Sequence, residues 1–291
     1  MQVRGTCITP RKKLYKMITT KKRITWNFHN PDTLLKWKGV HTVCEESLCP
    51  NRLECSQLKT ATFLIGGKYC TRNCLFCNVQ HGKSDPISAF KDIEKNEILE
   101  AVKTLDLQFA VITSVNRDDD AESLALHFHE ICEELNHMNI GVELLIPDFH
   151  VKKYLLDIIA KASPKVIAHN LETVKRLSDE IRPQASYEKS LKVLQHYALH
   201  YPKIKVKSGF MVGLGETEEE ILMTIKDLKN SGIHILTIGQ YLQPGKHQTS
   251  VVKHYSDDFF LNIKDSAIKM GIKHVESGYF IRSSYKAGLY E

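Results

Sequence analysis

The 291-residue sequence contains no apolar run that approaches the roughly 20 residues of a membrane-spanning helix, which argues against a membrane protein. Nothing at its N-terminus resembles a secretory signal, so its eight cysteines are expected to be free thiols in a reducing compartment. No stretch rich in proline, glycine and serine divides the chain, and residues 1–30 contain no acidic residue. We therefore expect one globular catalytic domain in the cytoplasm, preceded by a basic segment that wraps the domain or docks an acidic partner.

The most informative group of residues is Cys70, Cys74 and Cys77, which have the spacing C-x3-C-x2-C. Thiolate-rich sites select iron–sulfur clusters or zinc over hard cations. A four-iron cluster held by three cysteines keeps one iron open to a small molecule. With Phe76 inside it, the run resembles the signature of radical S-adenosylmethionine (SAM) enzymes, in which the open iron binds the amino and carboxylate groups of the methionine part of SAM.

A second triad lies just upstream, at Cys44, Cys49 and Cys55, and it too lacks a fourth ligand. Two incomplete triads so close together indicate two 4Fe-4S clusters. The alternative is zinc, with His41 or His81 as a fourth ligand, although a zinc ribbon normally takes its ligands in two close pairs.

Apolar runs of β type alternate with amphipathic stretches, which predicts parallel strands joined by crossover helices. The expected strands are Ala61–Gly66, Phe109–Val115, Val142–Asp148, Val166–Leu171, Lys205–Val212 and Ile235–Leu242, with a candidate last strand at His274–Phe280. The expected helices are Asp92–Leu105, Ala121–Met138, Lys152–Ala162, Tyr187–His200 and Thr217–Ser231. Six units favour an α/β fold, a partial (β/α)6 TIM-like barrel of the radical SAM type at residues 59–255. An N-terminal extension, 1–58, carries the upstream cysteines, and 256–291 form a C-terminal helix and tail.

Chemistry in such barrels gathers where the strands end. The residues that follow the predicted strands are the cysteines, Asn116, Arg117, Asp118, Asp148, Asn170, Glu172 and Gly213–Glu216. Gly209, Met211, Gly213 and Glu216 match the G-x-I-x-G-x-x-E pattern that radical SAM enzymes place near adenine, with methionine in place of isoleucine. Glycines there let the backbone approach a flat ring closely.

From about His41 to Gly288 the chain resembles the lipoyl synthase family. The resemblance rests on the paired triads, Ile-Thr-Ser-Val-Asn-Arg-Asp-Asp, Leu-Ile-Pro-Asp-Phe, His-Asn-Leu-Glu-Thr-Val, Lys-Ser-Gly, Gly-Leu-Gly-Glu-Thr, Gly-Gln-Tyr-Leu-Gln-Pro and a closing Arg-Ser-Ser-Tyr. The chain departs from the family at Leu53, at Leu75 and at Asp119-Asp120-Ala121, which touch neither triad but put loop shape near the substrate in doubt.

The resemblance implies insertion of two sulfur atoms into the sixth and eighth carbons of a protein-bound octanoyl-lysine. The cluster on Cys70, Cys74 and Cys77 would cleave SAM to a 5′-deoxyadenosyl radical. Sulfur would come from the auxiliary cluster, whose implied ligands, and hence catalytic residues, are Cys44, Cys49, Cys55 and Ser284, with Ser283 as the alternative serine. An alkoxide is a weaker ligand for iron than a thiolate, which suits a cluster that is consumed. The implied SAM contacts are Asn170, Glu172, Lys207, Ser208, Gly209, Met211 and Gly213, with Arg182 and Arg117 as candidate neighbours of a carboxylate or a cluster.

The implied partners are octanoylated lipoyl carrier domains (E2 subunits of 2-oxoacid dehydrogenases and the H protein of glycine cleavage), a reductant such as flavodoxin or ferredoxin, and an iron–sulfur carrier protein. A nucleic-acid partner is not expected, because no basic region interleaved with aromatics follows the first segment. Two other readings stay open. One is a sulfur transferase such as a methylthiotransferase acting on tRNA or protein, and the other is a non-catalytic iron–sulfur or zinc scaffold.

Overall fold

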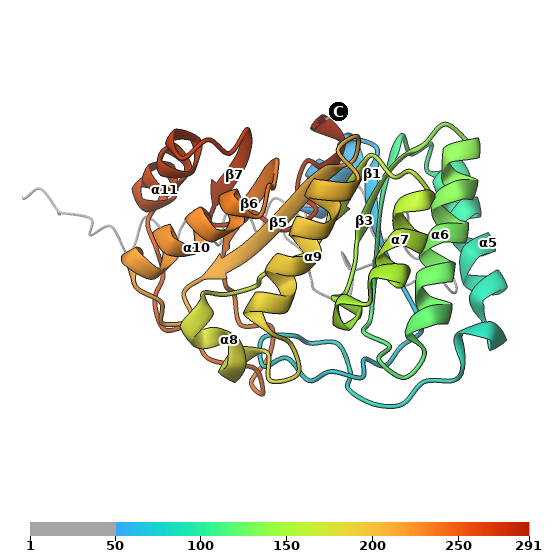
Figure 1. Cartoon of the computed structure of the whole chain (residues 1–291), viewed down its shortest axis with the longest axis horizontal. Helices are drawn as coiled ribbons and strands as arrows, with labels where there is room; N and C mark the ends of the chain where they lie inside the picture. Colours follow the sequence, from blue (N-terminus) through green and yellow to red (C-terminus); the bar gives the residue numbers. More distant parts are fainter. Residues whose placement is uncertain (1–50, 291) are drawn as a thin grey trace, which may run out of the picture.

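A computed structural model describes residues 51–290, and in them seven parallel strands form one sheet whose spatial order follows the chain (Figure 1). The strands are β1 Thr60–Ile65, β2 Phe109–Ser114, β3 Gly141–Leu145, β4 Val166–Ala168, β5 Lys205–Val212, β6 Ile235–Gln240 and β7 His274–Gly278. The helices are α4 Arg52–Gln57, α5 Lys91–Thr104, α6 Ala121–His137, α7 Lys153–Lys161, α8 Lys175–Ile181, α9 Tyr187–His200, α10 Glu218–Asn230 and α11 Asp257–Lys269, with 3-10 turns η1 Ile87–Ala89, η2 Phe149–Val151 and η3 Ala287–Leu289. None of the helices in this part of the chain is long and apolar enough to span a membrane.

The predicted partial barrel is confirmed, since six β/α units precede β7. Helix α10 illustrates how a local sequence pattern fixes where a helix begins. Its N-cap Thr217 accepts a hydrogen bond from the backbone of Glu220, whose carboxylate accepts one from the backbone of Thr217. This capping box fixes the helix start by satisfying backbone donors that the helix itself leaves free.

The two faces of the sheet bury different side chains, because successive residues of a strand point to opposite sides. On β2 and β5, Ala110, Ile112, Val206 and Phe210 belong to the large apolar core that includes the helices. Their neighbours point to the other face, the interior of the partial barrel. There Phe109 and Val111 pack against Ala287.

The interior is filled by the C-terminal segment, defined here as residues 279–290. Tyr290 packs there against Val166 of β4 and Ile235 of β6. In Figure 1 the C-terminus lies at one end of the sheet, and the long loop after β1 lies at the opposite end. The C-terminal segment therefore runs from the end where the strands finish, called the mouth here, toward the end where they begin.

Candidate functional site

The candidate site lies at the mouth, where the loop after β1 carries Cys70, Cys74 and Cys77. Backbone N–H groups of Arg72 and Asn116 donate to the sulfur of Cys70 at 3.4 and 3.3 Å. The backbone N–H of Val79 donates to the sulfur of Cys77 at 3.5 Å. Such donors stabilise the thiolate form of a cysteine.

Burial raises the pKa of Cys77 to about 12, and burial also raises the pKa of Cys74, partly offset by the positive charge of Arg182. Without a metal these two thiols therefore keep their protons at neutral pH. A bound cluster must displace those protons, which couples metal binding to proton release. Three thiols, inward-pointing N–H groups and a nearby guanidinium form a donor set that fits a 4Fe-4S cluster with one open iron. In residues 51–290, no group of three or more His, Cys, Asp or Glu side chains could hold a single metal ion.

Arg72, which lies between the first two cysteines, fixes this loop to the sheet. Its guanidinium donates to both carboxylate oxygens of Asp148, after β3, at 2.7 Å, and to both oxygens of Asp118, after β2, at 2.9 Å. Burial opposes ionisation of Asp148, but Arg72 prevails and holds the pKa of that carboxyl well below its usual range. His150 also reaches Asp118, at 2.8 Å. The sequence analysis missed Arg72, although its position inside the cysteine motif was a usable signal.

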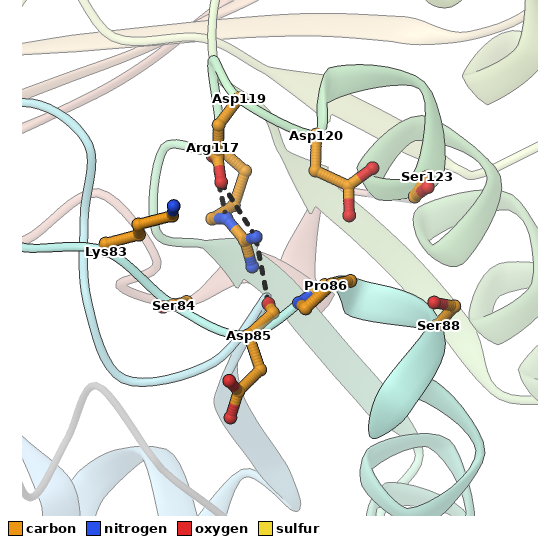
Figure 2. Close-up of a pocket in the computed structure, with 9 residues that line it drawn as sticks. All are labelled: Lys83, Ser84, Asp85, Pro86, Ser88, Arg117, Asp119, Asp120 and Ser123. Atoms are coloured by element: carbon orange, nitrogen blue, oxygen red, sulfur yellow. Dashed lines mark hydrogen bonds and ion pairs between the residues drawn. The ribbon is translucent and has the colours of Figure 1, made fainter.

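Arg117 has a different role from the one its position after β2 suggested. Its buried guanidinium donates to the carbonyls of Gly66 and Asp85 and pairs with Asp119 (Figure 2). These bonds tie together the two ends of the cysteine loop. A surface hollow of about 540 Å³ lies beside Arg117. These hydrogen bonds of Arg117 go to Gly66, Asp85 and Asp119 and not to a cysteine.

Asn170 and Glu172 lie at the mouth beside the end of β4. The chain there extends the pairing with β5, because Gly209 accepts from Leu171 N–H and Met211 N–H donates to the Glu172 carbonyl at 2.9 Å. Glu172 adopts a left-handed backbone, with φ of 66°. That conformation is uncommon outside glycine and often marks a functional site. The Asn170 amide donates to the Glu172 carboxylate at 2.9 Å.

Arg182 and His169 are buried side chains that bond the backbone around Asn170 and Glu172. Burial raises the pKa of Glu172, and Arg182 and Asn170 lower it in part. The Arg182 guanidinium donates to the Leu171 carbonyl at 2.8 Å. The ring of His169 bonds the Ile146 carbonyl at 2.8 Å and the Ser190 hydroxyl at 2.9 Å. Arg182 is thus held beside both Cys74 and Glu172.

The glycines at the end of β5 let its backbone pack closely against side chains of β6. A Cβ at Gly209 would lie 2.3 Å from Thr237 Oγ1, and one at Gly213 would lie 2.2 Å from the Gln240 amide. Glu216 accepts from the backbone N–H groups of Gly213 and Leu214, at 2.6 and 2.9 Å. Glu216 therefore holds the turn itself, while half-buried Met211 lies on the interior side of the strand.

Two of the expected SAM contacts are not brought to the mouth. The Lys207 ammonium is fully buried lower in the interior, 2.8 Å from the carboxylate of Glu143. Ser208 follows the alternation of β5 and lies on the helix-facing side, where its hydroxyl has no hydrogen-bond partner among the described residues. The Lys207 ammonium is paired with Glu143 of β3, and the Ser208 side chain faces away from the interior.

The C-terminal segment contacts the first described residues of the chain, at Asn51 and in α4. The Tyr285 hydroxyl donates to the carboxylate of Glu54 at 2.7 Å, across 231 positions of sequence. The Asn51 amide donates to the Phe280 carbonyl at 2.5 Å. Ser284 precedes Tyr285 and Cys55 follows Glu54, so this bond links the two segments that carry Ser284 and Cys55. Cys44 and Cys49 lie outside the described residues.

The comparisons agree with this geometry. The model of the radical SAM superfamily matches residues 64–228. The lipoyl synthase of Koribacter versatilis is 43% identical over 96% of this chain and 92% of its own length. That of Glaesserella parasuis is 46% identical over 86% of this chain and 78% of its own. This chain belongs to the lipoyl synthase family. The crystal structure of Streptococcus suis SuiB shares the fold, with a TM-score of 0.57 at 15% identity over 92% of this chain and 61% of that one.

We predict that Arg72→Met destabilises this lipoyl synthase family member by roughly 3–5 kcal/mol, because two carboxylates lose their buried partner. The matched control is Arg176→Met, which removes a half-exposed arginine that pairs with Glu220 and should cost far less stability. Urea unfolding of the metal-free chain measures both. Equal losses in the two variants would contradict the role given to Arg72.

A second prediction concerns pH. Burial and the charge of Arg182 lower the pKa of His169 to about 4, against about 6.5 in an unfolded chain. Between these values the unfolded chain binds a proton that the folded chain does not, so stability should fall as pH drops from 6.5 toward 4. His169→Gln should flatten that part of the stability profile, whereas His137→Gln, which removes an exposed ring, should not. An unchanged slope in His169→Gln would refute this assignment.

Proposed function

We propose that this chain inserts two sulfur atoms into the sixth and eighth carbons of a protein-bound octanoyl-lysine, giving the lipoyl group. The observation that carries the proposal is the bond between Tyr285 and Glu54, which brings the Arg-Ser-Ser-Tyr motif to the helix that holds Cys55. This bond supports a serine of that motif as the fourth ligand of the upstream triad. The family membership supports the same reaction.

When bound, the cluster on Cys70, Cys74 and Cys77 supplies SAM with an electron for radical formation, and the auxiliary cluster supplies sulfur. The residues of the chain position and shield these groups. Arg72 fixes the cysteine loop to β2 and β3 through Asp118 and Asp148. Because Arg72 and Asp148 are buried, this anchoring also excludes water from the inner side of the loop.

For SAM we propose that Asn170 and Glu172 bind the polar groups of the ligand and that the backbone of β5 at Gly209 and Gly213 lines the adenine site. Arg182, held beside Glu172 and Cys74, is suited to the methionine carboxylate because a guanidinium binds carboxylates with two parallel hydrogen bonds. Lys207 and Ser208 are left out of this set for the geometric reasons given above.

For the auxiliary cluster we propose Cys44, Cys49, Cys55 and Ser284 as ligands. The two serines of the motif differ in their surroundings. The Ser283 hydroxyl donates to the amide oxygen of Asn170 at 3.2 Å, which commits it to the SAM side of the mouth. Ser284 lies between that bond and the Tyr285–Glu54 bond, which links its segment to the helix that carries Cys55. This arrangement favours Ser284 over Ser283.

The partners proposed for the reaction are an octanoylated lipoyl carrier domain, a low-potential reductant such as flavodoxin or ferredoxin, and an iron–sulfur carrier that restores the consumed cluster. A reducing compartment such as the cytoplasm suits the free thiols. The alternative of a tRNA methylthiotransferase is not favoured, since the relatives at 43% and 46% identity are named lipoyl synthases.

The two half-reactions should separate by mutation. Cys70→Ala should abolish formation of 5′-deoxyadenosine from SAM, because it removes a ligand of the only proposed route for the electron. Cys55→Ala should still form 5′-deoxyadenosine while no sulfur enters an octanoyl-lysyl peptide, as read by mass. Lipoyl product at the normal rate from Cys55→Ala would exclude its cluster as the sulfur source.

The two serines should separate as well. Ser284→Ala should lower sulfur insertion into the octanoyl peptide by about tenfold or more while leaving the affinity for SAM unchanged. Ser283→Ala should instead weaken SAM binding a few-fold, because it frees the side chain of Asn170. Equilibrium binding of SAM and single-turnover mass spectrometry measure the two effects. The reverse pattern would make Ser283 the ligand.

A further inference from the structure

At the mouth the C-terminal segment is held by hydrogen bonds and by Tyr279, which packs in the main core. Ser283 donates to Asn170 and Tyr285 donates to Glu54, as described above. The carbonyl of Ile281 lies so close to β6 that a Cβ at Gly239 would come within 2.2 Å of it. These contacts lie before Ser284 or at Tyr285, and the segment beyond Tyr285 is held separately.

The other end of the segment is held by buried packing where the strands begin. Ala287 packs on Phe109 and Val111 of β2. Tyr290 is only 6% exposed and packs between Val166 of β4 and Ile235 of β6. The segment thus contacts several strands of the sheet at this end.

Tyr290 also covers the buried Glu143–Lys207 ion pair. The Lys207 ammonium lies 5.6 Å from the centre of the Tyr290 ring, within the range of a cation–π contact. The Lys205 ammonium donates to the Tyr290 carbonyl. Both carboxylate oxygens of Glu143 bond Lys207, at 3.0 and 2.8 Å, and neither side chain is exposed. An ion pair in a protein interior is costly unless its surroundings shield and satisfy it.

We propose that Tyr290, seated on the Glu143–Lys207 pair, is a positioning residue that holds Ser284 at the auxiliary cluster from the opposite end of the barrel. This inference rests on the proposed function, since it requires Ser284 as a ligand. The two positions are six steps apart along the chain, and a fully extended chain of that length spans only about 20 Å. Ser284 therefore stays within that distance of Tyr290 while Tyr290 stays in place.

The chemistry of the ligand explains why such an anchor matters. A serine oxygen binds iron more weakly than a thiolate, so it must be supplied at high local concentration. Tethering makes its return to the cluster intramolecular, and the effective concentration depends on the length and stiffness of the tether. An anchor outside the cluster's own surroundings can hold the segment even after Ser284 has released the iron.

The test compares variants of the full chain with both clusters loaded, exposed anaerobically to an iron chelator. Tyr290→Ala should release iron from the auxiliary cluster about tenfold faster than the unmodified protein, because truncating a buried aromatic removes the packing that holds the end of the segment against β4 and β6. Capacity to cleave SAM should persist, since the other cluster is untouched. Tyr290→Phe should behave as the unmodified protein, because the Tyr290 hydroxyl has no hydrogen-bond partner among the described residues. The control Tyr154→Ala removes a half-exposed ring of α7 and should change nothing.

Hydrogen exchange of the metal-free chain gives a readout that needs no cluster. In Tyr290→Ala the amides of Ile281 and Tyr285 should exchange faster, while those of β2 and β5 keep their protection. If Tyr290→Ala loses protection in the strands too, the milder Tyr290→Leu replaces it in both measurements.

The outcomes separate the two proposals. If Ser284→Ala releases iron faster and the Tyr290 variants do not, with unchanged exchange at Ile281 and Tyr285, the anchor is refuted and the serine ligand stands. If Ser284→Ala releases iron at the unmodified rate, the serine ligand is refuted, and the anchor with it.

Discussion

The interior of the partial barrel has to be filled, and the last residues of the chain fill it. The strands direct Phe109, Val111, Val166 and Ile235 inward, and these apolar side chains need a partner that water cannot provide. Ala287 and Tyr290 supply that partner. Because the C-terminal segment must reach the far end of the interior, it has to pass the mouth on its way. The packing requirement thereby places the Arg-Ser-Ser-Tyr motif beside α4.

A second constraint acts on the opposite side of the mouth, where the cysteine loop contains no helix or regular strand, only an isolated bridge between Cys70 and His81. Arg72 anchors the loop by charge, through two carboxylates that follow two different strands. Arg117 closes the base of the same loop through backbone carbonyls. The two proposed cluster sites are therefore organised by different forces, since ion pairs hold the loop of one and apolar packing holds the serine of the other.

Much of the fold could be read from the sequence, because its patterns are local. Strand β5 and helix α9 were predicted with the bounds that the structure has, Lys205–Val212 and Tyr187–His200. Short α8 was not predicted, since seven residues show too little periodicity. At the site, the spacing of the cysteines along the sequence predicted an iron–sulfur cluster. The partner of Lys207 could not be predicted, because Glu143 lies 64 positions away. The interior position of Tyr290 depends on the curving of the whole sheet into a partial barrel, which no local pattern encodes.

The most direct test of the account is diffraction from crystals of the cluster-loaded protein at the iron absorption edge. Anomalous scattering locates iron without assumptions about its ligands. The account predicts two separate groups of iron atoms, one bound by Cys70, Cys74 and Cys77 and one by Cys44, Cys49, Cys55 and the oxygen of Ser284. A single group of iron atoms, or a second group without Ser284 although the C-terminal segment is ordered elsewhere, would contradict it.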